Sequence, residues 1–151
     1  PKWVFQDESG RPLTREALLD RMKEHIFTVM RRYKGLVHGW DVVNEAIKPD
    51  GSFRENGWLD IIGEDYILKA FEFAHEADPD ALLFYNDYGA EGVCPKANAV
   101  YTLVEDLVKR GVPIHGVGLQ MHIYDFAPDD ASLRNVLQEL AEEYPLRLTI
   151  S

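Results

Sequence analysis

The stretch Ala81-Leu82-Leu83-Phe84-Tyr85-Asn86-Asp87-Tyr88 is a short apolar run that ends in polar residues. A helical pattern over residues 64–77 precedes it and ends before Pro79, since proline disfavours a helical residue in front of it. Pro95 opens the next helical pattern, which continues to Gly111. The run between these helices is too short to be another helix, so we expect a buried strand over residues 81–85.

The alternation of helix and strand extends in both directions from this run. Amphipathic helices are predicted for residues 14–33 and 131–143, where apolar side chains recur at helical spacing. Further strands are predicted for residues 36–43, 114–121 and 146–150. Near-continuous apolar strands that alternate with helices predict a parallel α/β sheet covered by helices. The pattern recurs every 30 to 45 residues, roughly the size of one unit of a (β/α)8 TIM barrel, and four strands are about half of such a barrel.

Charge and composition exclude several classes of function. The chain has 26 acidic and 16 basic residues and a net charge of −10, which would repel nucleic acid or an anionic membrane surface. Its apolar runs are far too short to cross a bilayer, and its first residues show no export pattern. Cys94 is the single cysteine and is interpreted as a small structural residue. We expect no metal or other cofactor, because paired histidines, clustered thiols and a glycine-rich loop before a helix are all absent from the sequence.

Polar side chains follow each of the first three predicted strands. These strand-end residues are Asn44 and Glu45, Asn86, and Gln120 and His122. In a parallel α/β sheet the ligand site lies beyond the carboxyl ends of the strands. An acid such as Glu45 directly after a buried run must be solvated or paired in a cleft. The sequence therefore predicts a polar cleft at this edge of the sheet.

Each strand-end residue also has a structural interpretation when it is taken alone. Glu45 could cap a helix or lie in a solvated loop. Asn44 and Asn86 could serve turn formation, because asparagine bonds its own backbone and tolerates left-handed conformations. His122 could be a core histidine and Gln120 a hydrogen-bonding residue at a strand end. Their joint occurrence at the strand ends favours a functional site.

Other polar residues are interpreted as structural. Asp87 could be a second catalytic carboxylate, but it lies in an Asn-Asp-Tyr-Gly stretch and we favour a turn. His25 and His75 fall on predicted helices, and His115 opens a predicted strand.

The motif Trp40-Asp41-Val42-Val43-Asn44-Glu45-Ala46 resembles the acid/base motif of glycoside hydrolase family 10, the retaining endo-1,4-β-xylanases. Further motifs resemble those of the family and occur in the same order along the chain. They are Trp58, residues 62–67, Ala70-Phe71, Ala77-Asp78-Pro79, residues 85–88 and residues 116–122. The similarity covers nearly the whole chain. The resemblance implies that residues 1–151 are a partial catalytic (β/α) barrel domain, truncated at both ends.

The resemblance implies a catalytic role for four of the strand-end residues. Glu45 is similar to the general acid/base, and Asn44 to the side chain that hydrogen-bonds the sugar hydroxyl beside the scissile bond. Gln120 resembles a group that orients the acid/base. His122 resembles one that holds the nucleophile.

The resemblance also implies the substrate contacts and the nucleophile. Tyr85 and Asn86 are similar to contacts on the leaving-group side of the scissile bond. In the family the last strand continues into a Thr-or-Ser-Glu-Leu-Asp stretch whose glutamate is the nucleophile. Leu148-Thr149-Ile150-Ser151 matches the approach to it, so we expect the nucleophile immediately after Ser151 and an isolated 151-residue chain that is inactive.

The implied partners are xylan or xylo-oligosaccharides and the missing barrel half of the same parent chain. The resemblance implies an extracellular protein, and an intracellular location stays open.

Two other functions also stay open. One is a carbohydrate-binding barrel fragment without catalysis that uses Tyr85, Tyr88, Tyr124 and Trp58 as stacking surfaces. The other is an unrelated barrel enzyme of small-molecule metabolism, because this fold hosts many reactions.

Overall fold

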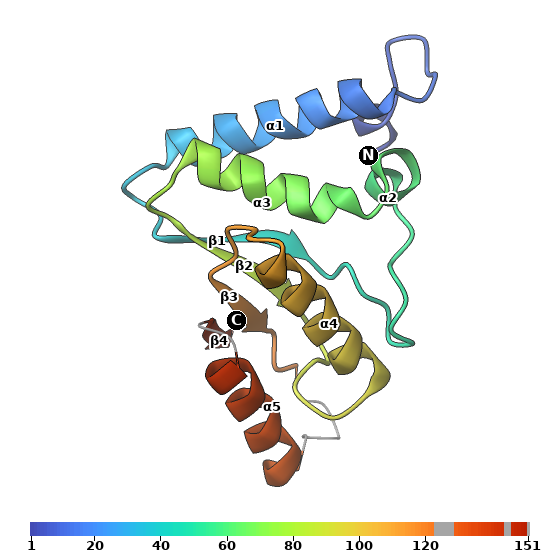
Figure 1. Ribbon diagram of the computed structural model, residues 1–151. Helices are drawn as coiled ribbons and strands as arrows, with labels where there is room; N and C mark the ends of the chain where they lie inside the picture. The colour runs from blue at the N-terminus through green and yellow to red at the C-terminus, as the bar shows by residue number, and fades with distance from the viewer. Residues whose placement is uncertain (123–128, 144–145, 151) are drawn as a thin grey trace.

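The computed structural model describes residues 1–122, 129–143 and 146–150. Within these residues four strands form one parallel sheet in the order β1-β2-β3-β4 (Figure 1). The strands are β1 (Gly39–Asn44), β2 (Leu82–Asp87), β3 (Gly116–Leu119) and β4 (Arg147–Ile150). Each strand pairs with the next one in the chain, which is the winding of a (β/α)8 barrel and not of an open doubly wound sheet.

Helices connect successive strands and cover one face of the sheet. The long helices are α1 (Arg15–Arg32), α3 (Asp65–Ala77), α4 (Pro95–Lys109) and α5 (Asp130–Glu143). A short helix α2 (Gly57–Ile62) precedes α3, and a 3-10 turn η1 (Lys2–Val4) lies near the start of the chain. Helices α1 and α3 lie side by side, with α3 next to β1, whereas α5 lies beside β4 (Figure 1).

Local sequence signals explain where these helices begin. Thr14 caps α1, because its side-chain oxygen accepts a hydrogen bond from the Ala17 N–H at 3.3 Å. Cys94 caps α4 in the same way through its sulfur, 3.4 Å from the Ala97 nitrogen. The single cysteine therefore has the structural role that the sequence predicts.

The two faces of the sheet carry different residues. The face toward the helices is packed with fully buried side chains such as Leu83, Tyr85 and Val117. On the opposite face glycines leave room for larger neighbours. A Cβ atom at Gly118 would lie 2.5 Å from the Asn86 Oδ1 atom. The absence of a side chain at this position therefore gives Asn86 the space in which it reaches toward β1.

The predicted elements differ from the observed ones mainly at their ends. Strand β1 begins at Gly39 rather than at residue 36, and its pairing with β2 is irregular between Asp41 and Val43, which indicates a β-bulge. Strand β2 continues to Asp87, so the turn predicted at Asp87 is wrong. Strand β3 ends at Leu119, two residues before Met121, which has a left-handed φ of 48°.

Candidate active site

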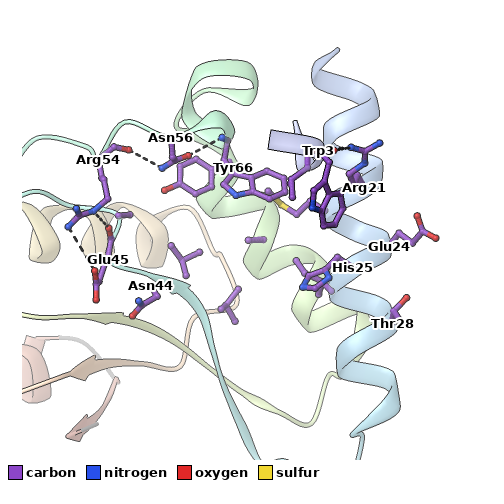
Figure 2. Close-up of a pocket in the computed structure, with 18 residues that line it drawn as sticks. Trp3, Arg21, Glu24, His25, Thr28, Asn44, Glu45, Arg54, Asn56 and Tyr66 are labelled. Carbon is purple, nitrogen blue, oxygen red and sulfur yellow. Dashed lines mark hydrogen bonds and ion pairs between the residues drawn. The ribbon is translucent and has the colours of Figure 1, made fainter. Parts of the chain in front are cut away.

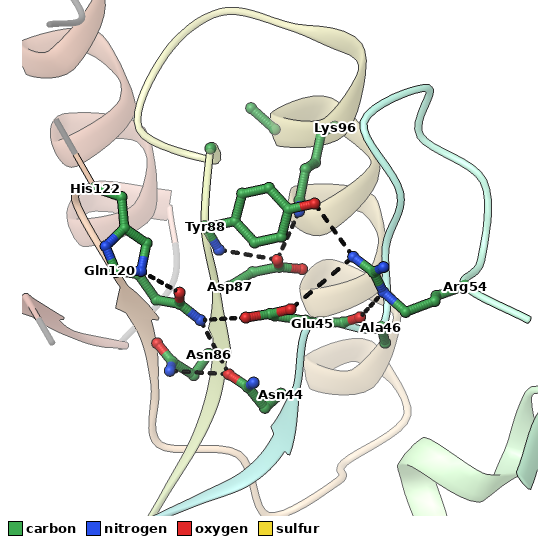
Figure 3. Close-up of polar contacts among 12 residues, drawn as sticks. Asn44, Glu45, Ala46, Arg54, Asn86, Asp87, Tyr88, Lys96, Gln120 and His122 are labelled. Carbon is green, nitrogen blue, oxygen red and sulfur yellow. Dashed lines mark hydrogen bonds and ion pairs between the residues drawn. The ribbon is translucent and has the colours of Figure 1, made fainter. Parts of the chain in front are cut away.

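The carboxyl ends of β1, β2 and β3 bring the predicted polar residues into one hydrogen-bonded network (Figure 3). Asn86 Nδ2 donates to Asn44 Oδ1 at 3.0 Å. Gln120 Nε2 lies 3.1 Å from both Asn44 Oδ1 and Glu45 Oε1 and donates to them. His122 Nε2 lies 2.8 Å from Gln120 Oε1. Of the predicted site residues, only Tyr85 lies outside this network.

These contacts fix the orientation of two side-chain amides. The Asn44 side-chain oxygen accepts hydrogen bonds from both Asn86 and Gln120, so the Nδ2 group of Asn44 points away from these two donors. Gln120 presents its nitrogen to Glu45 and its oxygen to His122. Because that oxygen can only accept, the Nε2 atom of His122 is the donor.

Glu45 is held in an unusual backbone conformation. Its φ is 56°, in the left-handed region that non-glycine residues rarely adopt, at a cost of about 1 to 3 kcal/mol. Its N–H donates to the Asn86 carbonyl at 2.9 Å, and its carbonyl accepts from Arg54 Nε at 2.9 Å. The next N–H, of Ala46, donates to the Tyr85 hydroxyl at 3.1 Å. These contacts hold the peptide groups on both sides of Glu45.

Arg54 is the cation nearest to Glu45 among the ion pairs of the described residues. Its Nη2 atom lies 4.0 Å from Glu45 Oε2 and donates to the Tyr88 hydroxyl at 3.2 Å. The hydrogen bond to Tyr88 is the main cause that raises the pKa of Arg54 above its ordinary value. Arg54 lies in the connection between β1 and α2, where no periodic pattern marked it, and the sequence analysis missed it.

A buried ion pair lies behind Glu45, on the helix side of the sheet. Lys96 Nζ is 2.7 Å from Asp87 Oδ1, and the side chains of the two residues are 4% and 0% exposed. The Tyr85 hydroxyl donates to Asp87 Oδ2 at 2.6 Å, and the Tyr88 N–H donates to Asp87 Oδ1 at 2.9 Å. Asp87 is therefore neither a turn residue nor placed as a second carboxylate in the cleft.

Tyr85 is fully buried in this structure. Burial is the main cause that raises the pKa of Tyr85 far above its ordinary value, and the neighbouring Asp87 adds to it. Its hydroxyl is already bonded to Asp87 and to the Ala46 N–H. A direct sugar contact by Tyr85, as the sequence analysis expected, does not fit this placement.

A pocket of about 730 Å³ opens between α1 and β1 (Figure 2). Asn44, Glu45 and Arg54 line one end of it, and Trp3 and His25 line the other. Trp58 also lines the pocket, but its ring packs edge-on against Phe5 with the ring centroids 5.2 Å apart. Glu45 thus lies at the end of this pocket that Asn44 and Arg54 also line.

The remaining predicted residues have simpler positions. His115 Nδ1 accepts a hydrogen bond from the Leu83 N–H at 3.1 Å, which is a structural contact between β2 and the start of β3. Tyr124 lies outside the described residues.

Over residues 1–122, 129–143 and 146–150, no group of three or more histidine, cysteine or acidic residues could hold a metal ion. None of the described helices is both long and apolar enough to cross a membrane.

The sequence profile of "Glycosyl hydrolase family 10" matches residues 1–151. An endo-1,4-β-xylanase of Geobacillus stearothermophilus is 55% identical over 124 residues, which cover 81% of this chain and 37% of that protein. Endo-1,4-β-xylanase B of Paenibacillus barcinonensis is 47% identical over 143 residues, which cover 93% of this chain and 43% of that protein. The chain therefore spans less than half the length of these curated relatives.

Several solved structures are also similar to this chain over nearly its whole length. A GH10 endoxylanase retrieved from a sugarcane soil metagenome has a TM-score of 0.94 and 46% identity, covering 100% of this chain and 43% of that chain. An intracellular xylanase from Thermoanaerobacterium saccharolyticum has a TM-score of 0.93 and 42% identity, covering 100% and 48%. Xylanase 10B of Thermotoga petrophila, solved in complex with xylobiose, has a TM-score of 0.90 and 43% identity, covering 98% and 44%.

Proposed function

This chain belongs to glycosyl hydrolase family 10, and on that premise we propose that the protein carrying it cleaves β-1,4-xylosidic bonds of xylan with retention, using Glu45 as general acid/base. The observation that carries the proposal is the Glu45 carboxylate at the carboxyl edge of the sheet, 3.1 Å from the Gln120 amide. Two relatives named endo-1,4-β-xylanases and a relative solved with xylobiose support the substrate class.

In the proposed mechanism Glu45 acts twice. It first protonates the oxygen of the leaving sugar, and it then takes a proton from the water that opens the glycosyl-enzyme. Gln120 donates to Oε1 of Glu45, so Oε2 is the oxygen that carries the transferred proton. Arg54, 4.0 Å from Oε2, stabilises the carboxylate that remains after the transfer.

The second carboxylate is proposed to be a glutamate that follows Ser151. In retaining enzymes the two carboxyl groups lie about 5 to 5.5 Å apart. The position fits the pairing of the strands, because Ile150 is opposite Leu119 in the sheet and Gln120 follows Leu119 directly. A glutamate just beyond β4 would therefore lie near Gln120 and His122. We propose that His122 holds this nucleophile.

Asn44 is proposed to bind the sugar hydroxyl beside the scissile bond. Its oxygen is occupied by Asn86 and Gln120, which leaves its Nδ2 group as the donor to a ligand. Asn86 is only 7% exposed, so we propose that it acts mainly by holding Asn44 and contributes little surface to the leaving-group side.

Residues 1–151 are proposed to be part of one catalytic barrel domain, completed by other segments of the same parent chain. The stacking residues required by a binding module without catalysis do not favour that alternative, since Tyr85 is buried and Trp58 packs on Phe5. Family membership likewise argues against an unrelated metabolic enzyme. It does not fix the location, because one matched structure is described as intracellular.

The role of Glu45 is tested by Glu45→Gln in the full-length protein. We expect kcat/KM on unsubstituted xylo-oligosaccharides, which reports the first, bond-breaking step, to fall by about 10² to 10⁴, the usual contribution of positioned acid/base groups. The loss of kcat/KM should be much smaller for aryl xylosides with good leaving groups, because their departure needs no proton. Glu55→Gln is the matched control, because Glu55 is an exposed carboxylate that pairs with Lys48. Equal losses of kcat/KM on both substrates in Glu45→Gln would contradict the role.

A further inference from the structure

The buried residues behind Glu45 are arranged in one chain of contacts, shown in Figure 3 for Lys96 and Asp87. Lys96 contacts Asp87 at 2.7 Å, Asp87 accepts from the Tyr85 hydroxyl at 2.6 Å, and that hydroxyl accepts from the Ala46 N–H at 3.1 Å. We call Lys96, Asp87 and Tyr85 the buried relay. It ends at the peptide group that directly follows Glu45.

Charge fixes the direction of every hydrogen bond in the buried relay. The Lys96 ammonium and the Asp87 carboxylate form an ion pair, and a carboxylate can only accept hydrogen bonds. The single proton of the Tyr85 hydroxyl must therefore go to Asp87. This leaves an oxygen lone pair directed at the Ala46 N–H. A neutral Asp87 could instead donate to the Tyr85 hydroxyl oxygen. The hydroxyl proton would then no longer be directed at Asp87, and it could point toward the Ala46 N–H and weaken that hydrogen bond.

The conformation at Glu45 depends on such support. A left-handed φ of 56° persists in a non-glycine residue only where its surroundings over-determine it. Release of the Ala46 N–H would allow the chain to relax toward an ordinary negative φ. The Glu45 side chain would then turn away from Gln120.

We propose that the buried relay consists of positioning residues that hold Glu45 in the left-handed conformation required for proton transfer. The inference rests on the proposed role of Glu45 as the acid/base. None of the three residues contacts the cleft, since Tyr85, Asp87 and Lys96 are all buried. Stability alone is a weak reason for the pair, because replacing a buried ion pair by apolar residues is often neutral or stabilising.

The first test compares Tyr85→Phe with Tyr101→Phe in the full-length protein. Each variant removes one tyrosine hydroxyl, and that of Tyr101 bonds the Ala90 carbonyl at 2.9 Å, outside the network of Glu45. For Tyr85→Phe we expect kcat/KM on unsubstituted xylo-oligosaccharides to fall about 10- to 100-fold, since small misplacements of a catalytic group have effects of that size. The KM for xylo-oligosaccharides and kcat/KM on activated aryl xylosides should change little. Tyr101→Phe should keep the wild-type ratio of the two activities.

A second test covers the case in which Tyr85→Phe folds poorly. Lys96→Met leaves Asp87 buried without its cation, and we expect a lower unfolding temperature together with the same selective loss of kcat/KM on xylo-oligosaccharides. The double variant Asp87→Leu with Lys96→Met removes both charges. We expect it to regain much of the unfolding temperature while the loss on xylo-oligosaccharides remains, because Tyr85 still lacks its acceptor.

The outcomes separate the two proposals. If Glu45→Gln loses both activities equally, the proposed function fails. If Glu45→Gln is selective but Tyr85→Phe behaves like Tyr101→Phe, the positioning role is overturned. It is also overturned if the double variant regains the substrate ratio together with its unfolding temperature, because the buried relay would then serve stability alone.

Discussion

Two non-glycine residues with left-handed backbones lie within the site, and each is held by a neighbouring polar group. They are Glu45, at φ 56°, and Met121, at φ 48°. The Met121 N–H donates to Glu91 Oε1 at 2.9 Å, and Glu91 is itself buried. Since Met121 separates Gln120 from His122, its conformation sets the directions of both side chains. Backbone strain of this kind accompanies functional sites.

Replacement of Glu91 is expected to disturb this second left-handed residue. Glu91→Ala removes the acceptor of the Met121 N–H and should lower the free energy of unfolding by about 1 to 3 kcal/mol, with a loss of kcat on xylo-oligosaccharides. Glu91→Gln keeps an oxygen at the same place, so this variant should retain most of the stability and most of the kcat. Denaturant unfolding and steady-state kinetics of the full-length protein measure the two effects. Indistinguishable alanine and glutamine variants would refute this role of Glu91.

At the scale of single residues, the sequence predicted the cleft side of the site better than its support. Glu45 and Gln120, which were singled out because polar residues follow apolar strands and because the motifs resemble a known family, do lie in contact with each other. The ion pair of Asp87 with Lys96 was missed, because Asp87 was interpreted as a turn residue and Lys96 was not singled out, although Lys96 falls in the same helical stripe as the buried Ala97, Val100 and Val104. A lysine on the apolar stripe of a helix was the available signal for a buried ion pair.

At the scale of elements, apolar periodicity predicted the four long helices and four strands, and the predicted barrel class is confirmed. The ends of β1 and β3 were wrong because a β-bulge and the left-handed Met121 depend on tertiary contacts that local patterns do not contain. The short helix α2 was missed because six residues are too few for a periodic pattern. Its cap, Asn56, accepts from the N–H groups of Trp58 and Leu59 and was the only local signal.

The pairing of β2 with β3 is expected to depend on pH through His115. Burial is the main cause that lowers the pKa of His115 below 6.5, and its Nδ1 must be unprotonated to accept from Leu83. Below pH 6.5 the unfolded chain therefore binds a proton that the folded chain does not bind until a lower pH. The unfolded state binds more protons in that window, so the free energy of unfolding falls as the pH is lowered through it.

The measurement is denaturant unfolding of the full-length protein between pH 5 and 8, roughly the range in which an ordinary histidine changes charge. His115→Asn keeps an acceptor near the position of Nδ1 but cannot titrate, so the fall in stability below pH 6.5 should become smaller. His38→Asn is the control, because His38 is exposed. An unchanged pH dependence in His115→Asn would be evidence against this assignment.

At the scale of the whole molecule, the sheet has two edges. In the part of the chain that the structure describes, β1 pairs only with β2 and β4 pairs only with β3. Large apolar side chains are also exposed there, among them Trp3, Leu36 and Ile150. Open strand edges and exposed apolar surface favour association.

Residues 1–151 expressed alone are accordingly expected to be poorly soluble or molten. Circular dichroism should show helical signal without a sharp thermal transition, and a hydrophobic dye should bind. The full-length protein should instead unfold cooperatively, because its remaining strands would cover both edges. A monomeric 151-residue chain with a sharp, cooperative transition would disprove this expectation.

The alternation of side chains along β2 has a consequence for protein engineering. Tyr85 and Asp87 point to the helices while Asn86, between them, points to the cleft, so one strand supports Glu45 from both of its faces. Substitutions in β2 should therefore spare both the odd-numbered positions 85 and 87 and the cleft-facing Asn86. Insertion or deletion of a single residue in β2 would exchange the two sets and disable both supports at once.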